Sequence, residues 1–219
     1  MAVTNRVKNV VATAVTLTSI LVLYGSLHGF GPAAHTGAHA AMGQVLGQEA
    51  LKLRGSGGRI LVLARDTAVD RNVCSDAQWK SFKRTIKHSG ASISSATFVR
   101  LNPIRLIAAP TGDFFTLIKK SSENDVIVSF IGPPVLSDEQ VAQLGEQRPR
   151  IVAVCSGWTP RQVNLRRIFE QHLLSSAIIS RQDSTRSTAA SSEFKDSFGL
   201  VTTANLSELP LFASSASGR

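Results

Sequence analysis

The sequence predicts an α/β fold with a doubly wound, mainly parallel sheet of five to six strands and helices on both faces. Short runs rich in Val and Ile alternate with amphipathic segments along residues 38–210. Successive runs lie about 25 to 35 residues apart, which is typical of strands joined by crossover helices. The chain has 219 residues, 43% of them hydrophobic, which suits one globular domain with additional segments.

An apolar segment at residues 9–30 precedes this domain, and we expect it to form a transmembrane or signal helix. Its apolar centre has about 18 residues, close to the roughly 20 that span a bilayer. Arg6 and Lys8 precede it, which predicts the N-terminus inside and the domain outside. An uncleaved anchor and a signal peptide cleaved at the A-x-A sequence of residues 38–40 both remain open.

The anchor would make a single-pass protein of the inner (cytoplasmic) membrane with an extracytoplasmic C-terminal domain. If residues 1–40 are cleaved, the domain is secreted. The predicted parts are a cytoplasmic stretch, the apolar helix, a linker, an α/β lobe and a disordered tail, at residues 1–8, 9–30, 31–37, 38–210 and 211–219.

The first half of the domain has two predicted helices and two predicted strands. A helix at 38–54 has an apolar stripe and ends at the glycines of 55–58. The run at 59–64 suits a strand buried on both faces. We expect Ser75-Asp76 to cap a helix over 77–90, with Trp79, Phe82 and Ile86 on its buried stripe. The alternating run at 91–100 predicts a more peripheral second strand.

The second half continues the alternation. Two prolines predict a loop at 101–113, and Ser137 with Gln140 predicts a capping box at a helix start. The remaining predicted strands are 125–131, 150–155, 175–181 and an edge strand at 198–204, with helices at 114–122 and 161–174. The polar stretch at 183–192 is expected to be flexible.

In such sheets ligands bind beyond the carboxyl ends of the strands, near the point where strand order reverses. We therefore predict the following ligand-binding residues: Arg65, Asp66, Gly132, Pro133, Ser156 and Trp158. Trp158 is the strongest single candidate, although a tryptophan at a strand end caps a core as readily as it stacks on a sugar. Gly132 and the two prolines after it predict a stiff, apolar rim that contacts something other than a charged ligand.

The charge pattern and the histidines exclude several classes of partner. The net charge is +9, but the basic residues are spread as singles and pairs without an aromatic platform, so no nucleic acid is expected. His35 and His39 have no third or fourth ligand nearby, so no metal is expected. The glycines of 55–58 precede a strand instead of following one, which argues against a phosphate loop. We predict no cofactor.

Cys74 and Cys155 form no zinc motif, and we expect buried free thiols, or a disulfide if the domain is extracytoplasmic. A hydrolase-type enzyme on a flavodoxin-like sheet, with Cys155 or Ser156 as nucleophile, is an alternative, but the G-x-S-x-G pattern is absent. A degenerate scaffold that binds nothing is a further alternative. The preferred prediction has no catalytic residue.

Several segments in order resemble one lobe, the second, of the type I periplasmic solute-binding proteins. The strand "GGRILVLA" is similar to the family's "GKIAVL", and "DVIVSFIG" at 125–132 to "DAIFAAND". "PRIVAVCSG" at 149–157 is similar to "P.IAVVGFD", and "FKDSFGLVTTAN" at 194–205 to the family's last strand. The aspartates that end two of the family motifs are replaced by Gly132 and Gly157, and the first lobe is missing.

The resemblance implies a flavodoxin-like three-layer sandwich that binds ligand on one lobe. The expected function is a membrane-anchored, extracytoplasmic domain that binds a small sugar-like or other neutral ligand, or a partner protein such as a membrane permease or sensor. A homodimer, which could rebuild a two-lobed cleft, is also open.

Overall fold

The computed structural model describes residues 13–20, 22–23, 36–67, 72–99, 111–156, 163–180 and 194–209. Contacts divide the chain into two units, residues 1–35 and 36–219. The described part of the first unit is helical. Among the described residues, no helix has both the length and the apolar character needed to cross a membrane.

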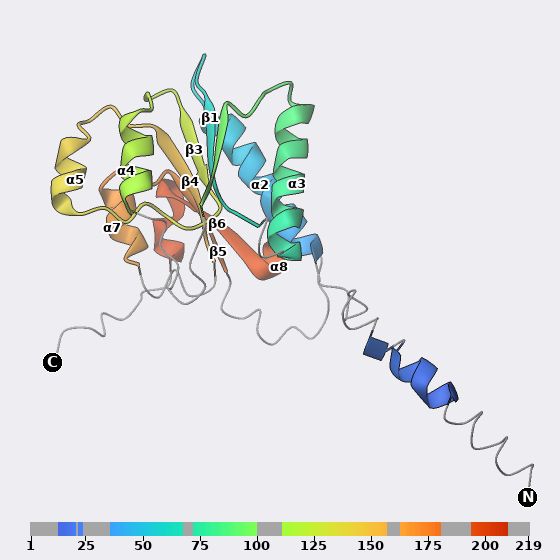
Figure 1. Ribbon diagram of the computed structural model, residues 1–219. Coiled ribbons are helices and arrows are strands. Elements are labelled where there is room, and N and C mark those ends of the chain that lie inside the picture. The colour runs from blue at the N-terminus through green and yellow to red at the C-terminus, as the bar shows by residue number, and fades with distance from the viewer. Residues whose placement is uncertain are drawn as a thin grey trace, which may run out of the picture. The chain divides into compact units, whose positions relative to one another are not determined.

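The second unit is built on one mixed sheet of six strands in the order β2-β1-β3-β4-β5-β6 (Figure 1). The strands are β1 (Ile60–Arg65), β2 (Ser95–Val99), β3 (Val126–Ser129), β4 (Arg150–Cys155), β5 (Ser176–Ser180) and β6 (Phe198–Thr202). The first five are parallel, and β6 pairs with β5 in the antiparallel direction. The predicted α/β class with a mainly parallel sheet is confirmed, including the edge position of the last strand.

Helices cover both faces of this sheet. One face carries α2 (Thr36–Leu53) and α3 (Val73–His88), and the other carries α4 (Thr111–Lys119), α5 (Asp138–Gln143) and α7 (Leu165–Glu170) (Figure 1). Two short helices flank β6, namely α8 (Phe194–Ser197) and the 3₁₀ helix η2 (Thr203–Glu208). This is the three-layer arrangement that the alternating sequence predicts.

Alternation along the strands separates the hydrophobic core into two halves. On β1, Ile60 and Val62 pack towards α2 and α3, whereas Leu61 and Leu63 pack towards α4 and α7. All four side chains are at most 5% exposed, which explains why the run is apolar without a break.

Some boundaries differ from the predicted ones because local hydrogen bonds outweigh composition. The α3 helix begins before Ser75-Asp76, since the Asn72 side chain accepts hydrogen bonds from the backbone N–H groups of Cys74 and Ser75. The predicted loop at 101–113 ends earlier than expected, because Thr111–Lys119 is helical. The capping box of Ser137 and Gln140 is present as predicted.

The predicted helix at 161–174 is the least accurate assignment. Its described part is helical only over Leu165–Glu170, after an Asn164 side chain that accepts from the Arg167 N–H. The helix then ends in a turn in which His172 has a positive φ of 55°. Residues 157–162, 181–193 and 210–219, which include the predicted flexible stretch and tail, lie outside the described part of the chain.

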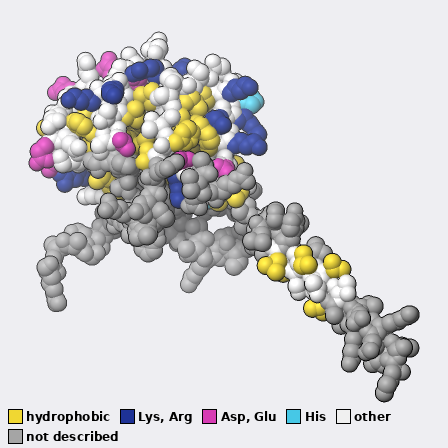
Figure 2. All heavy atoms as spheres, in the orientation of Figure 1, with side chains coloured by type: hydrophobic (Ala, Val, Ile, Leu, Met, Phe, Trp, Pro, Cys, Tyr) yellow, Lys and Arg dark blue, Asp and Glu magenta, His cyan; other side chains and the backbone are white. Residues whose placement is uncertain are grey.

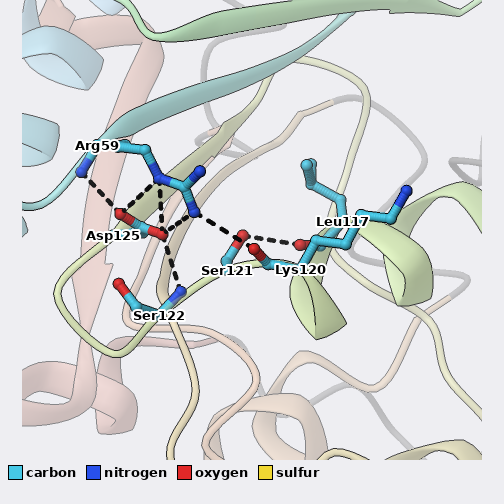
Figure 3. A network of polar contacts seen from close by, with 6 residues as sticks. All are labelled: Arg59, Leu117, Lys120, Ser121, Ser122 and Asp125. Carbon is cyan, nitrogen blue, oxygen red and sulfur yellow. Dashed lines mark hydrogen bonds and ion pairs between the residues drawn. The ribbon is translucent and has the colours of Figure 1, made fainter.

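An ion pair joins the residues just before two neighbouring inner strands, β1 and β3 (Figure 3). Asp125, just before β3, is 2% exposed. Its Oδ1 accepts from the Arg59 backbone N–H at 2.7 Å, and its Oδ2 accepts from Arg59 Nη2 at 2.7 Å and from the Ser122 N–H at 2.8 Å. Arg59 Nη2 also donates to the Lys120 carbonyl at the end of α4. The carboxylate therefore holds β1, β3 and the α4 terminus together.

The Arg59 guanidinium and the backbone donors keep the pKa of Asp125 well below its usual range. A lowered folded-state pKa means that the ionised carboxylate adds stability above the unfolded pKa of about 4. That contribution is lost as the pH falls below this value towards the folded-state pKa.

We expect Asp125→Asn to lower the free energy of unfolding at pH 7 by about 2 to 3 kcal/mol, because the amide has no negative charge and has only one oxygen to accept from the donors of Arg59 and Ser122. Urea unfolding at pH 7 and pH 3 measures this, and the gap between variant and wild type should shrink at pH 3. Asp138→Asn is the control, because its ion pair with Arg167 is exposed and should contribute under about 1 kcal/mol. Equal losses in the two variants would contradict the role of the buried pair.

Candidate ligand-binding site

The strand order reverses between β1 and β3. The chain passes from β1 to its neighbour β2 on one side, then returns to form β3 on the other side of β1. Open parallel sheets bind ligands in the crevice outside the carboxyl ends of the strands at this point. The corresponding residues are Arg65 at the end of β1 and Phe130 just after β3.

A cleft of about 360 Å³, counted out to its open mouth, lies at this place. The centre of a water molecule can move within about 40 Å³ of it, which is room for one to a few water molecules. The lining residues come from three strand ends and the start of α3: Ala64, Arg65, Thr67, Ser75, Asp76, Gln78, Trp79, Phe98 and Phe130. The cleft is therefore a shallow site at the edge of the sheet.

Aromatic side chains form one side of the cleft. Trp79 meets Phe98 and Phe130 edge to face, with ring centroids 5.9 Å apart in each pair. Phe82, which is fully buried, stacks beneath Trp79 at 5.8 Å. The Lys83 ammonium lies 5.2 Å from the Trp79 ring centre. Because buried rings support Trp79, the half-buried indole has a defined position.

The other side of the cleft is polar and carries both signs of charge. Arg65 contributes a guanidinium and Asp76 a carboxylate, and Thr67 donates a hydrogen bond to Asp76 Oδ1 at 3.3 Å. Gln78 is 8% exposed, and its Nε2 lies 2.9 Å from Nδ1 of His39 on α2. Since the two charges offset one another, the cleft suits a neutral ligand better than an ion.

Phe98 continues the aromatic surface outwards along the edge strand. It is 51% exposed, and Val73 at the start of α3 is 59% exposed. Figure 2 shows hydrophobic side chains gathered on this side of the molecule, with Lys and Arg side chains on both margins. A partly exposed aromatic group beside a cleft is a recurrent feature of binding surfaces.

The predicted site residues lie at this edge but do not all line the cleft. Arg65 does, and Asp66 follows it, with its backbone N–H bonded to the Val99 carbonyl. Gly132 and Pro133 are buried, and neither is among the lining residues. Gly132 has a φ of 111°, a conformation that favours glycine, and its carbonyl accepts from Ser129 Oγ at 2.6 Å.

The remaining two predicted residues follow β4 in the sequence. Ser156 is half-buried and is not among the residues that line the cleft. Trp158 lies outside the described residues.

The sequence did not identify Trp79 or Gln78 as site residues. Trp79 was assigned to the buried stripe of a helix, and Gln78 was given no role. A topological signal could have found them. A crossover helix starts at the carboxyl edge of the preceding strand, so the first turns of α3 must face the strand ends. The half-buried side chains of those turns were therefore candidates for the site wall as well as for the core.

A polar depression also lies at the opposite, amino edge of the sheet, lined in part by Glu49, Lys52, Arg150 and Ser176. Its charged groups serve the fold. Glu49 Oε1 accepts from Ser176 Oγ at 2.9 Å and pairs with Lys52, and Arg150 donates to the Leu53 carbonyl at the end of α2. Within the described residues, no three His, Cys, Asp or Glu side chains converge to hold a metal ion.

Cys155 is completely buried, and burial raises the pKa of its thiol. A neutral thiol without solvent access is a poor nucleophile. Cys74, at the start of α3, is half-exposed, and both cysteines are free. These surroundings disfavour Cys155 as the nucleophile of the alternative, enzymatic interpretation.

We expect a thiol reagent such as DTNB to label one cysteine of the native protein, Cys74, and both cysteines after denaturation. In Cys74→Ser, native labelling should fall by at least about 100-fold, because the remaining thiol is buried and protonated. Rapid labelling of Cys155 in that variant would restore the nucleophile hypothesis.

Neither a protein-family model nor a curated protein matches the chain. Among solved structures, one similar chain is a carbohydrate transporter solute-binding protein from Agrobacterium radiobacter, in complex with D-arabinose. It is 10% identical with a TM-score of 0.48, and the match covers 80% of this chain and 61% of that one. A protein from Mycobacterium smegmatis is 12% identical with a TM-score of 0.41, covering 65% of this chain and 47% of the other.

At such low TM-scores, neither likeness assigns a ligand to this chain. The function has to come from the cleft itself.

Proposed function

We propose that residues 36–219 form a single-lobed binding domain that holds a small neutral ligand in the cleft beside Trp79. The observation that carries the proposal is a cleft at the switch point of the sheet whose lining combines a supported aromatic cluster with polar side chains. A sugar-like molecule combines a flat C–H face with a rim of hydroxyl groups. The indole suits the first once the Lys83 ammonium that lies over its ring moves aside, and Asp76 and Gln78 suit the second.

The size of the cleft sets the expected affinity. Ligand pockets usually measure about 300 to 1,000 Å³ and cover most of the ligand. This cleft reaches that range only when its open mouth is included, so one edge of the ligand is held while the rest stays in water. A dissociation constant of about 1 mM corresponds to roughly −4 kcal/mol, which a stacked ring and two or three hydrogen bonds can supply.

A thermal-shift screen with monosaccharides, purine bases and amino acids tests the proposal on the full chain. We expect millimolar ligand to raise the melting temperature of the wild type by a few degrees, about 1 kcal/mol of linkage. Trp79→Ala and Asp76→Asn should each lose most of this shift, because one removes the stacking surface and the other an acceptor. Trp158→Ala, measured in the same screen, tests whether the residue that the sequence favours as a ligand contact takes part in binding.

Phe115→Ala is the matched control for Trp79→Ala. Phe115 is also half-buried under a lysine, with Lys119 Nζ 5.7 Å from its ring centre, but it lies on α4, on the other face of the sheet. A shift that persists in Trp79→Ala and Asp76→Asn would refute the site. No stabilisation of the wild type would refute a small-molecule ligand and favour a partner protein at Phe98.

We further propose that residues 9–30 hold this domain to the inner membrane with the domain outside. The basic residues before the apolar segment support this orientation. A C-terminal alkaline phosphatase fusion expressed in bacteria should be active, and the chain should stay in the membrane fraction after a carbonate wash. An inactive phosphatase would contradict the orientation. Release of a shortened chain would show cleavage in place of anchoring.

A further inference from the structure

Two glycines on α2 let its backbone approach α3 closely. A Cβ atom on Gly43 would lie 2.1 Å from the Gln78 carbonyl oxygen, and one on Gly47 would lie 2.8 Å from Thr85 Cβ. Real side chains do not tolerate such distances, so the approach depends on glycine at both positions. The contact places His39, one turn before Gly43, beside the Gln78 side chain in the cleft wall.

The hydrogen bond between these two side chains has a defined direction. Gln78 Nε2 lies 2.9 Å from His39 Nδ1, and since an amide nitrogen only donates, this arrangement goes with the tautomer in which Nδ1 is unprotonated and accepts. Because the Gln78 amide nitrogen is bonded to the imidazole, the group that remains for a further hydrogen bond is the amide oxygen, Oε1. Gln78 is among the residues that line the cleft, so this oxygen is the acceptor that its amide can offer there.

Protonation of His39 reverses this arrangement. In the imidazolium both ring nitrogens carry hydrogen and can only donate, so His39 Nδ1 no longer accepts from the amide nitrogen of Gln78. Gln78 is 8% exposed. Two N–H donors, one on the Gln78 amide and one on His39 Nδ1, would then face each other away from water, which costs free energy. Turning the Gln78 amide by half a rotation restores the hydrogen bond, because Gln78 Oε1 then accepts from the Nδ1–H of His39. The amide nitrogen of Gln78 is released.

We propose that His39 is a positioning residue for the binding cleft, and that its protonation turns the Gln78 amide over and replaces an acceptor in the cleft wall by a donor. This inference concerns the regulation of the site and rests on the proposed function for its biological meaning. At pH values above the pKa of His39, the cleft favours ligand groups that donate, such as N–H. Below it the cleft favours groups that accept, such as carbonyl or carboxylate oxygens.

The surroundings of His39 place the transition in acidic conditions. The ring is half-buried and packs against Phe198 on β6, with centroids 5.8 Å apart, and burial lowers its pKa below 6.5. The charged groups on the elements that pack against this end of α2 include Asp76 and Lys80 in the first half of α3 and Lys195 on α8, and Arg65 and Asp66 stand at the end of β1. Burial is the cause that outweighs them, so at neutral pH the imidazole is the acceptor that the geometry requires.

NMR of the full chain without any ligand tests this inference. Long-range ¹H–¹⁵N spectra of the imidazole should show His39 Nδ1 unprotonated at pH 7, with a titration midpoint below 6.5. The side-chain NH₂ signals of Gln78 should move with the same midpoint. A neutral His39 with its hydrogen on Nδ1, or Gln78 signals that do not move, would overturn the proposal.

Variants separate positioning from simple packing. His39→Phe keeps the ring contact with Phe198 but has no acceptor, so the Gln78 signals should lose their pH dependence. His39→Asn keeps an acceptor that does not titrate, and should hold Gln78 in its high-pH state throughout. His88→Asn is the control at the other end of α3, where the ring bonds to the Arg84 carbonyl, and should leave the Gln78 titration unchanged.

A Gln78 titration that survives in His39→Asn would also overturn the proposal, even if His39→Phe fails to fold. Because the measurement needs no ligand, its failure and that of the proposed function can be told apart. A negative ligand screen refutes the proposed function, whereas immobile Gln78 signals refute only the switch.

Discussion

The Arg59–Asp125 ion pair is the interaction on which the rest of the sheet depends. It joins the residues just before β1 and β3, two neighbouring inner strands, and so aligns Ile60 with Val126. Close backbone contact supports it, since a Cβ on Gly58 would lie 1.8 Å from the carbonyl oxygen of Asn124. Once the amino ends are aligned, the register determines where both strands end, and their ends form the base of the cleft.

The second constraint is the close packing of α2 and α3. Helices without glycine at their contact lie about 8 to 10 Å apart, and a smaller side chain at the contact lets them approach more closely. Gly43 and Gly47 allow that approach here, which brings His39 against Gln78 and holds Trp79 over the sheet edge. The core and the binding wall therefore share α3, so changes in the packing of α2 should reach the cleft.

Most of the fold could be predicted because its signals are local. The strand at Arg150–Cys155 agrees residue for residue with the apolar run, and the capping box of Ser137 sits where its two side chains indicate. Errors fell where a single side chain moves a boundary. Asn72 starts α3 earlier than Ser75 would, and the turn after Glu170 ends α7 before its apolar pattern stops.

The candidate site was only partly predictable. Arg65 could be named because it follows a buried strand, and the carboxyl edge of the sheet is where ligands bind. Gly132 and Pro133 also follow a strand, yet both are buried. The Ser129 hydroxyl holds the turn before them by donating to the Gly132 carbonyl and accepting from the Ile131 N–H. Position along a strand indicates the edge of the sheet, whereas the direction of each turn depends on contacts with residues that are distant in sequence.

The sequence by itself determined the α/β class, the order of the elements and the apolar strands, because periodicity and turn residues act over a few neighbours. Only the tertiary structure decided that Trp79 belongs to a cleft, that Gln78 meets His39 across 39 positions of sequence, and that Cys74, unlike Cys155, is partly exposed. Those facts depend on how α2 and α3 pack together and on which strands lie side by side, and no local pattern encodes either.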